Sequence, residues 1–119
     1  MSSSARPLRG QVFHVDLDGI GPHYWLVVSN NQRNAHLDDV LVVMITTTPP
    51  RSPRISYVPL TTGQDRFEGW VKCDDIGPLF TDELGPVKGS LSPSAMRLVE
   101  LGLGFALNLP RPAWGSWRV

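Results

Sequence analysis

With 119 residues, of which 41% are hydrophobic and 18% charged, the chain has the composition of one ordinary globular domain, and a disordered protein is excluded. Its 11 basic and 11 acidic residues balance, so no overall field attracts it to nucleic acid or membrane, and any polyanion site must be local. The single cysteine, Cys73, excludes an intrachain disulfide. Together with an N-terminus that lacks the apolar segment of a signal peptide, it favours a cytoplasmic protein.

The predicted domain covers residues 9–109, between a flexible lead at 1–8 and a tail at 110–119 that carries Trp114 and Trp117. Alternating apolar and polar residues predict a first strand at 11–17. A glycine-containing turn at 18–22 joins it to a second strand at 24–28, with His23 at the exit of the loop.

The segments at 24–28 and 40–45 are the most apolar and β-branched in the chain, which predicts two central strands buried on both faces. A polar stretch at 29–39 connects them. The second strand ends in Thr46, Thr47 and Thr48, so three hydroxyls leave the core where a loop begins. Strand ends beside loops commonly hold functional sites.

A basic, proline-rich loop with Arg51 and Arg54 then leads to an edge strand at 55–58, which Pro59 is expected to end. After a polar loop at 61–68, a strand at 69–73 is expected to stop at the acidic pair that follows it. Residues 76–85 are predicted to be irregular, and a last short strand is expected within 86–91.

Ser92 followed by Pro93 predicts the start of a helix that continues to Leu107. Apolar residues cover most of its circumference, more than one small sheet needs, which indicates a second subunit packed against it and hence a homodimer. The predicted fold class is α+β, mainly β: a small barrel of five to seven strands with a C-terminal helix.

Five blocks of this sequence resemble, in order and spacing, the MazF/PemK/Kid toxin family. The blocks are residues 9–18, residues 25–30 with Asn34 following, residues 42–47, residues 69–74 and residues 89–92. The resemblance implies an SH3-like barrel, a homodimer and a metal-independent endoribonuclease of a type II toxin–antitoxin system. Such an enzyme cleaves single-stranded RNA to a 2′,3′-cyclic phosphate and a 5′-hydroxyl, uses no cofactor and is neutralised by a cognate antitoxin.

Cleavage of RNA by its own 2′-hydroxyl requires a base, an acid and donors for the charge on the phosphorane. Lys72 and Asp74 lie two positions apart, so on a continuing strand they would share a face. By resemblance to Kid, Asp74 is the general base and Lys72 a phosphate clamp or acid, and Thr46 matches the active-site threonine of the family. His23 stands where the family carries an arginine, and an imidazole can act as acid or base at neutral pH.

Four further residues are predicted to contact the substrate: Arg51, Arg54, Asn34 and Thr47. The cationic groove formed by Lys72 and the two arginines is expected to receive a short acidic segment of the antitoxin. The spacing of His14, His36 and Cys73 does not suit a zinc site, so no metal is predicted.

Each residue of this site also has a purely structural explanation. Asp74 can bind backbone N–H groups at a strand end, Lys72 can be a solvated strand residue, Thr46 a β-branched strand residue and His23 a loop residue. Two other functions also remain open. One is a CcdB-like gyrase poison without catalytic activity, suggested by the Trp114-Gly115 pair, and the other is a degenerate homologue that only binds its antitoxin, which the loss of family arginines at His23 and Gly77 would permit.

Overall fold

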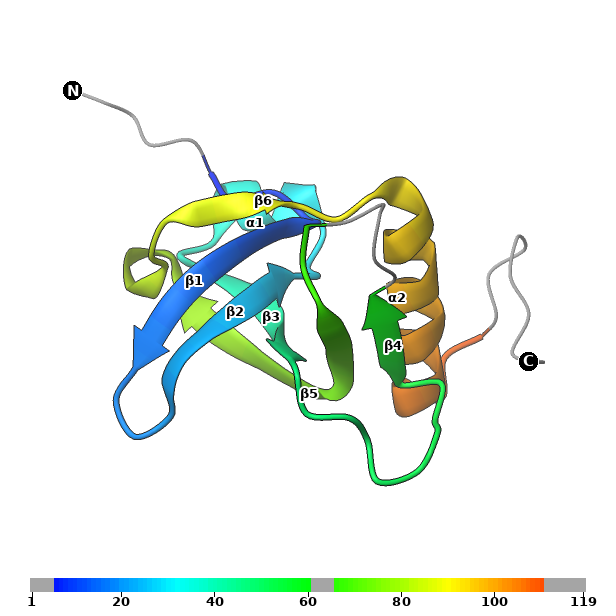
Figure 1. The fold of residues 1–119 in the computed structure, drawn as a ribbon. Helices are drawn as coiled ribbons and strands as arrows, with labels where there is room; N and C mark the ends of the chain where they lie inside the picture. Colours follow the sequence, from blue (N-terminus) through cyan, green and yellow to red (C-terminus); the bar gives the residue numbers. More distant parts are fainter. Residues whose placement is uncertain (1–5, 61–65, 111–119) are drawn as a thin grey trace.

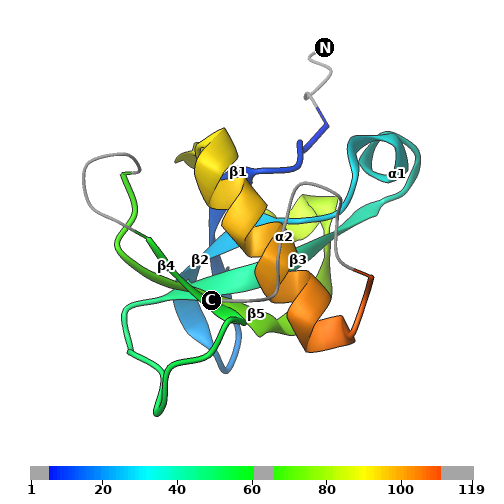
Figure 2. The same ribbon diagram turned by 90° about the vertical axis from the view of Figure 1, so that its right-hand side faces the viewer.

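A computed structural model of the chain describes residues 6–60 and 66–110 (Figure 1). The elements in chain order are β1 (Gln11–Leu17), β2 (Gly21–Val27), α1 (Asn31–His36), β3 (Asp39–Thr46), β4 (Tyr57–Leu60), β5 (Gly69–Phe80), the short 3₁₀-helix η1 (Thr81–Glu83), β6 (Val87–Ser90) and α2 (Pro93–Leu107). The strands form one antiparallel sheet in the order β4-β5-β3-β2-β1-β6. The sheet curls into a half-barrel, and α2 packs beside β4 and β5 (Figure 1 and Figure 2). The predicted fold class is therefore confirmed. In the part of the chain that the structure describes, no helix has the length and apolar character needed to span a membrane.

Two hydrophobic cores occupy opposite faces of the central strands. Alternate residues of β1, β2 and β3, such as Val12, Leu26 and Val43, pack in one core with residues of α2. Their neighbours along the chain, such as Val42, pack in the other core with Leu79 of β5. β3 from Val40 to Val43 and β2 from Trp25 to Val27 are thus buried on both faces, because each strand lies between two other strands and between two apolar layers.

β5 runs to Phe80, so the prediction that it stops at Asp74 and Asp75, with irregular structure after them, is wrong. Its second half pairs with β3 through Gly77 and Pro78, the residues that suggest a break in the sequence. Pairing with the long, central β3 overrides the local preference of these two residues. The edge strand β4 likewise lies at 57–60 and contains Pro59 instead of ending before it, because an edge strand tolerates a residue without an N–H donor.

β2 begins at Gly21, three residues earlier than predicted, so the hairpin loop is shorter and His23 lies within the strand opposite Val15. The polar stretch after β2 holds α1, a single short helix that the sequence analysis did not predict. Its first turn is capped by Asn30, whose side chain accepts a hydrogen bond from the Arg33 N–H.

α2 has the predicted bounds. Ser92 caps its first turn by accepting a hydrogen bond from the Ala95 N–H, and Pro93 occupies the first helical position. The helix ends at Leu107 and is capped by Asn108, which has a left-handed backbone (φ 56°) and whose N–H donates to the carbonyls of Gly104 and Phe105.

Candidate active site

Two of the four predicted catalytic residues, Lys72 and Asp74, lie where β5 bends. Val71 pairs with Ile45 of β3, whereas Ile76 pairs with Val43, so residues 72–75 of β5 face a single residue of β3, Met44. This bulge re-aims the side chains between its two paired ends, and bulges often occur beside active sites. The first half of β5 pairs with both β3 and the edge strand β4, whereas the second half pairs with β3 alone.

Asp74 is held by two side chains from the loop that precedes β4. The Ser56 hydroxyl donates to Asp74 Oδ2 at 2.9 Å, and Arg54 Nη1 lies 3.4 Å from the same oxygen. Ser56 is buried, whereas the Asp74 side chain is 36% exposed. The carboxylate is therefore fixed through one oxygen while the side chain still faces solvent, as a base that meets a substrate must do.

Lys72 does not pair with Asp74, which corrects the expected arrangement. Its Nζ lies 3.0 Å from Asp75 Oδ2, because the bulge turns the residue three positions on toward the ammonium group. The hydrogen bond that Lys72 donates to the Asp75 carboxylate raises the pKa of Lys72 above its usual value, in spite of an opposing effect of burial. Lys72 therefore remains a cation throughout the neutral range, opposite Tyr57 of β4.

Thr46, Thr47 and His23 come together in a second place, an open pocket of about 240 Å³ at the end of β3. Thr46 Oγ1 accepts a hydrogen bond from the Thr48 N–H at 3.1 Å, so the hydroxyl retains its own proton for another acceptor. Thr46 lies directly opposite Trp70 on β5, two residues before Lys72. The pocket therefore lies on the strand next to the one that carries Lys72 and Asp74.

The position of Thr46 depends on a close approach that only glycine permits. A Cβ on Gly69 would lie 2.0 Å from the Thr46 carbonyl oxygen, and Gly69 has φ +105°. Any other residue there would push the end of β3 away from β5.

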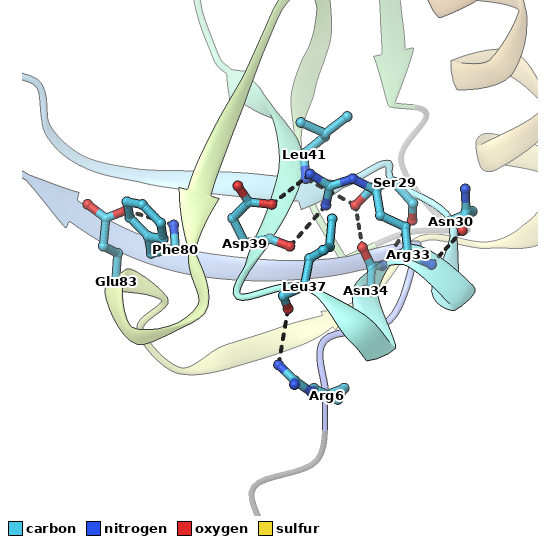
Figure 3. A network of polar contacts seen from close by, with 10 residues as sticks. All are labelled: Arg6, Ser29, Asn30, Arg33, Asn34, Leu37, Asp39, Leu41, Phe80 and Glu83. Carbon is cyan, nitrogen blue, oxygen red and sulfur yellow. Dashed lines mark hydrogen bonds and ion pairs between the residues drawn. The ribbon is translucent and has the colours of Figure 1, made fainter.

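Asn34 does not lie at this surface. It is 1% exposed in α1 and donates to the Ser29 carbonyl, while the Ser29 hydroxyl donates back to the Asn34 side-chain oxygen (Figure 3). The Ser29 hydroxyl also accepts from the Leu41 N–H, so this buried network ties α1 to β3. Asn34 therefore has a structural role, and we do not assign it to the substrate.

The remaining predicted residues are exposed: Arg51 and Thr47 lie in the segment between β3 and β4. The sequence did not indicate the roles of Ser56, which holds Asp74, and Asp75, which holds Lys72. Asp75 was visible as the second member of an acidic pair, but nothing in the spacing of Ser56 indicates that it meets a residue 18 positions away.

Cys73, between Lys72 and Asp74, points into the core and is fully buried. Burial, followed by the charge of Asp74, raises the pKa of the Cys73 thiol to about 12, so it is neutral and takes no part in the surface chemistry. Among residues 6–60 and 66–110, no three His, Cys, Asp or Glu side chains are grouped so that they could hold a metal ion.

Comparison with known proteins gives consistent matches over nearly the whole chain. The family model that matches residues 8–107 is described as a PemK-like, MazF-like toxin of type II toxin–antitoxin systems. Curated relatives named Endoribonuclease MazF1, from Mycobacterium bovis, and Endoribonuclease MazF4, from Mycobacterium tuberculosis, are each 43% identical over 106 residues, covering 89% of this chain and 97% of the relative.

Solved structures agree in fold. An endoribonuclease in complex with its cognate antitoxin, from a mycobacterial species, is 40% identical with a TM-score of 0.80, covering 92% of this chain and 100% of that chain. The MazE–MazF complex from Deinococcus radiodurans is 18% identical with a TM-score of 0.74, covering 90% of this chain and 100% of that chain, and shares the fold alone. The chain therefore belongs to the PemK-like, MazF-like family of toxins of type II toxin–antitoxin systems.

Proposed function

We propose that this toxin is an endoribonuclease that cleaves single-stranded RNA to a 2′,3′-cyclic phosphate and a 5′-hydroxyl without a metal ion. Asp74 accepts the proton of the attacking 2′-hydroxyl, and Lys72 and Arg54 stabilise the charge that grows on the phosphorane. Thr46 donates to a phosphate oxygen, and His23 supplies a proton to the departing 5′-oxygen. Arg51 and Thr47 contact the RNA on either side of the reacting phosphate.

The observation that carries this proposal is the contact of Asp74 with Ser56 and Arg54, on the same strand as the cation of Lys72 two residues earlier. A carboxylate that is fixed by two donors, one of them cationic, is suited to accept the proton of a hydroxyl that lies beside a phosphate. The identity to proteins named as endoribonucleases supports the same reaction.

Incubation of the purified protein with single-stranded RNA, with and without EDTA, tests the reaction directly. We expect cleavage to persist in EDTA and the products to end in a cyclic phosphate by mass spectrometry. Asp74→Asn should reduce the rate by about 10²- to 10⁴-fold with the fold unchanged. Asp82→Asn, on the exposed η1 turn, is the matched control and should cleave normally.

A folded Asp74→Asn variant that cleaves at the normal rate would refute the assignment of the base. His23 would then be the first candidate for the base, and His23→Ala should abolish cleavage. Intact RNA with the wild-type protein would instead support a degenerate homologue. Intact RNA together with a trapped gyrase complex would support the CcdB-like alternative, whose Trp114-Gly115 pair lies outside the described residues.

We further propose two protein partners and a cytoplasmic site of action. A second copy of the chain covers the side of α2 that carries Leu98 and Phe105, each about half exposed. A cognate antitoxin places an acidic segment over Lys72, Arg51 and Arg54, in competition with RNA. Simultaneous binding of that segment and RNA without loss of cleavage would contradict the proposed antitoxin site.

A further inference from the structure

The pocket at the end of β3 contains two aromatic side chains to which the proposed reaction gives no role. Besides His23 and the threonines at positions 46–48, it is lined by His14 of β1 and Tyr24 of β2. His14 and Tyr24 are directly opposite each other on the antiparallel pair. Both therefore project from the same face of the sheet into the same space.

The Tyr24 ring is held from two sides while it stays exposed. His14 meets it edge to face at a centroid distance of 5.5 Å and an interplanar angle of 73°. Phe67, from the segment before β5, meets it at 5.6 Å and 65°. Tyr24 is nevertheless 40% exposed, whereas Phe67 is 7% exposed. Two ring contacts fix the orientation of an aromatic surface that remains open to solvent.

The size and lining of the pocket fit one flat, polar-edged ring system. Its volume of about 240 Å³ lies below the roughly 300 Å³ at which sites for drug-sized ligands begin, so it suits one base more than a larger ligand. The hydroxyls of Thr47 and Thr48 can both donate and accept at a base edge. Among the described residues that line the pocket none is acidic, so nothing there repels the adjoining phosphates.

We infer that this pocket binds one nucleobase of the RNA, with Tyr24 as its stacking surface and His14 as a positioning residue for the Tyr24 ring. The inference rests on the proposed function and names the part of the RNA that lies beside the reacting phosphate. Tyr24 is opposite Ile45, which is opposite Val71, the neighbour of Lys72. Two strand spacings, about 10 Å in all, therefore separate the backbone of Tyr24 from the strand that carries Asp74.

Binding of short RNAs blocked by 2′-O-methyl groups, measured by fluorescence anisotropy beside cleavage of the unmodified RNAs, tests the pocket. Stacking of a base on an aromatic ring corresponds to about a 5- to 100-fold change in affinity. Tyr24→Val, which keeps a strand-forming residue, should weaken binding by that factor and raise KM more than it lowers kcat. Tyr24→Phe should recover most of the loss, and Phe80→Val, which removes an exposed aromatic ring elsewhere on β5, is the matched control.

Replacing single bases of the RNA by abasic sites identifies the bound position. With the wild-type protein one replacement should weaken binding as much as Tyr24→Val does, and in Tyr24→Val that same replacement should have no further effect. His14→Leu should reduce the preference for that base without moving the position.

If a folded Tyr24→Val keeps the wild-type affinity and base preference while cleavage continues, the base pocket is refuted and the nuclease function stands. If the blocked RNAs bind with the expected dependence on Tyr24 but unmodified RNA stays intact, the pocket stands and the nuclease function fails. Absence of binding to every RNA would overturn both.

Discussion

Lys72 and Asp74, only two positions apart, have different partners because the strand bends between them. Lys72 faces Asp75, and Asp74 faces Ser56 and Arg54. On a regular strand the two side chains would lie about 7 Å apart on one face, and the sequence spacing suggested that they act as a pair. In the structure each is held by its own partner, which separates the base from the cation of the proposed reaction.

The charge of Lys72, more than its shape, should matter for cleavage. Lys72→Ala should lower the cleavage rate by about 10²-fold and weaken RNA binding, because the phosphorane loses a cation. Lys72→Arg should retain much of both, since the guanidinium keeps the charge and can still pair with Asp75. Single-turnover kinetics would measure the effect, with Lys88→Ala on β6 as control. Equal losses in the alanine and arginine variants would show that the ammonium geometry is required.

The thiol of Cys73 should be unreactive until the protein unfolds. Its pKa is raised from 9.0 to about 12 by burial and by the charge of Asp74, so at pH 8 the folded protein holds the neutral thiol. Alkylation by iodoacetamide at pH 8 should be slow in buffer and fast in urea, as mass spectrometry would measure. Rapid modification of the folded protein would contradict the burial.

The raised pKa of Cys73 also makes the stability of the protein depend on pH. Because the pKa of Cys73 is higher in the folded state than in the unfolded state, its contribution is fully present below about pH 9 and is lost as the pH rises toward 12. Cys73→Ala should therefore flatten the fall of unfolding free energy across this range. Denaturant titrations of the two proteins at several pH values would measure it.

At the level of elements, the close packing of α2 on β4 and β5 depends on Gly102. A Cβ on Gly102 would lie 2.9 Å from Cys73 Sγ, 3.1 Å from the Ile55 carbonyl oxygen and 3.1 Å from the Val58 side chain. The helix can pack this closely only because position 102 has no side chain. Cys73 lies on β5 between Lys72 and Asp74, and Ile55 precedes Ser56. The packing of α2 therefore contacts the backbone segments that carry the site.

Gly102→Ala should destabilise the protein in spite of the higher helix propensity of alanine. Overpacking typically costs about 1–3 kcal/mol, whereas the propensity gain is about 1 kcal/mol. The backbone carbonyl of Ile55 cannot turn aside as a flexible side chain would, so we expect the overpacking to prevail. Denaturant unfolding would measure the difference.

Gly77→Ala is the control for this substitution, because an added methyl there meets nothing within 4 Å, and it should change stability by less than about 0.5 kcal/mol. The double variant Gly102→Ala with Cys73→Ala should recover part of the loss. A Gly102→Ala variant more stable than the wild type would mean that α2 shifts outward freely.

For the whole molecule, we expect the exposed side of α2 to decide the oligomeric state. Leu98 and Phe105 lie two helical turns apart on this side and leave a continuous apolar strip with Leu101 between them. Sedimentation at micromolar concentration should give a dimer, and Leu98→Glu with Phe105→Glu should give a folded monomer. Arg97→Gln, on the same helix, should leave the dimer intact. A wild-type monomer at that concentration would refute the proposal.

Much of the architecture could be predicted from local signals. The two β-branched runs indicated the central strands, and Ser92 with Pro93 indicated the first residue of α2, because caps and hydrophobic periodicity depend on neighbours in the chain. The resemblance of the successive blocks identified the toxin family, which the comparisons confirmed.

Only the tertiary structure decided the partners of the site. Pairing with β3 carried β5 through Gly77 and Pro78, and the bulge turned Lys72 toward Asp75 and Asp74 toward Ser56. The sequence by itself determined the central strands and α2, because capping and hydrophobic periodicity act between residues a few positions apart. The contacts that hold Asp74 and the Tyr24 ring join residues far apart in the chain, and only the curl of the sheet brings them together.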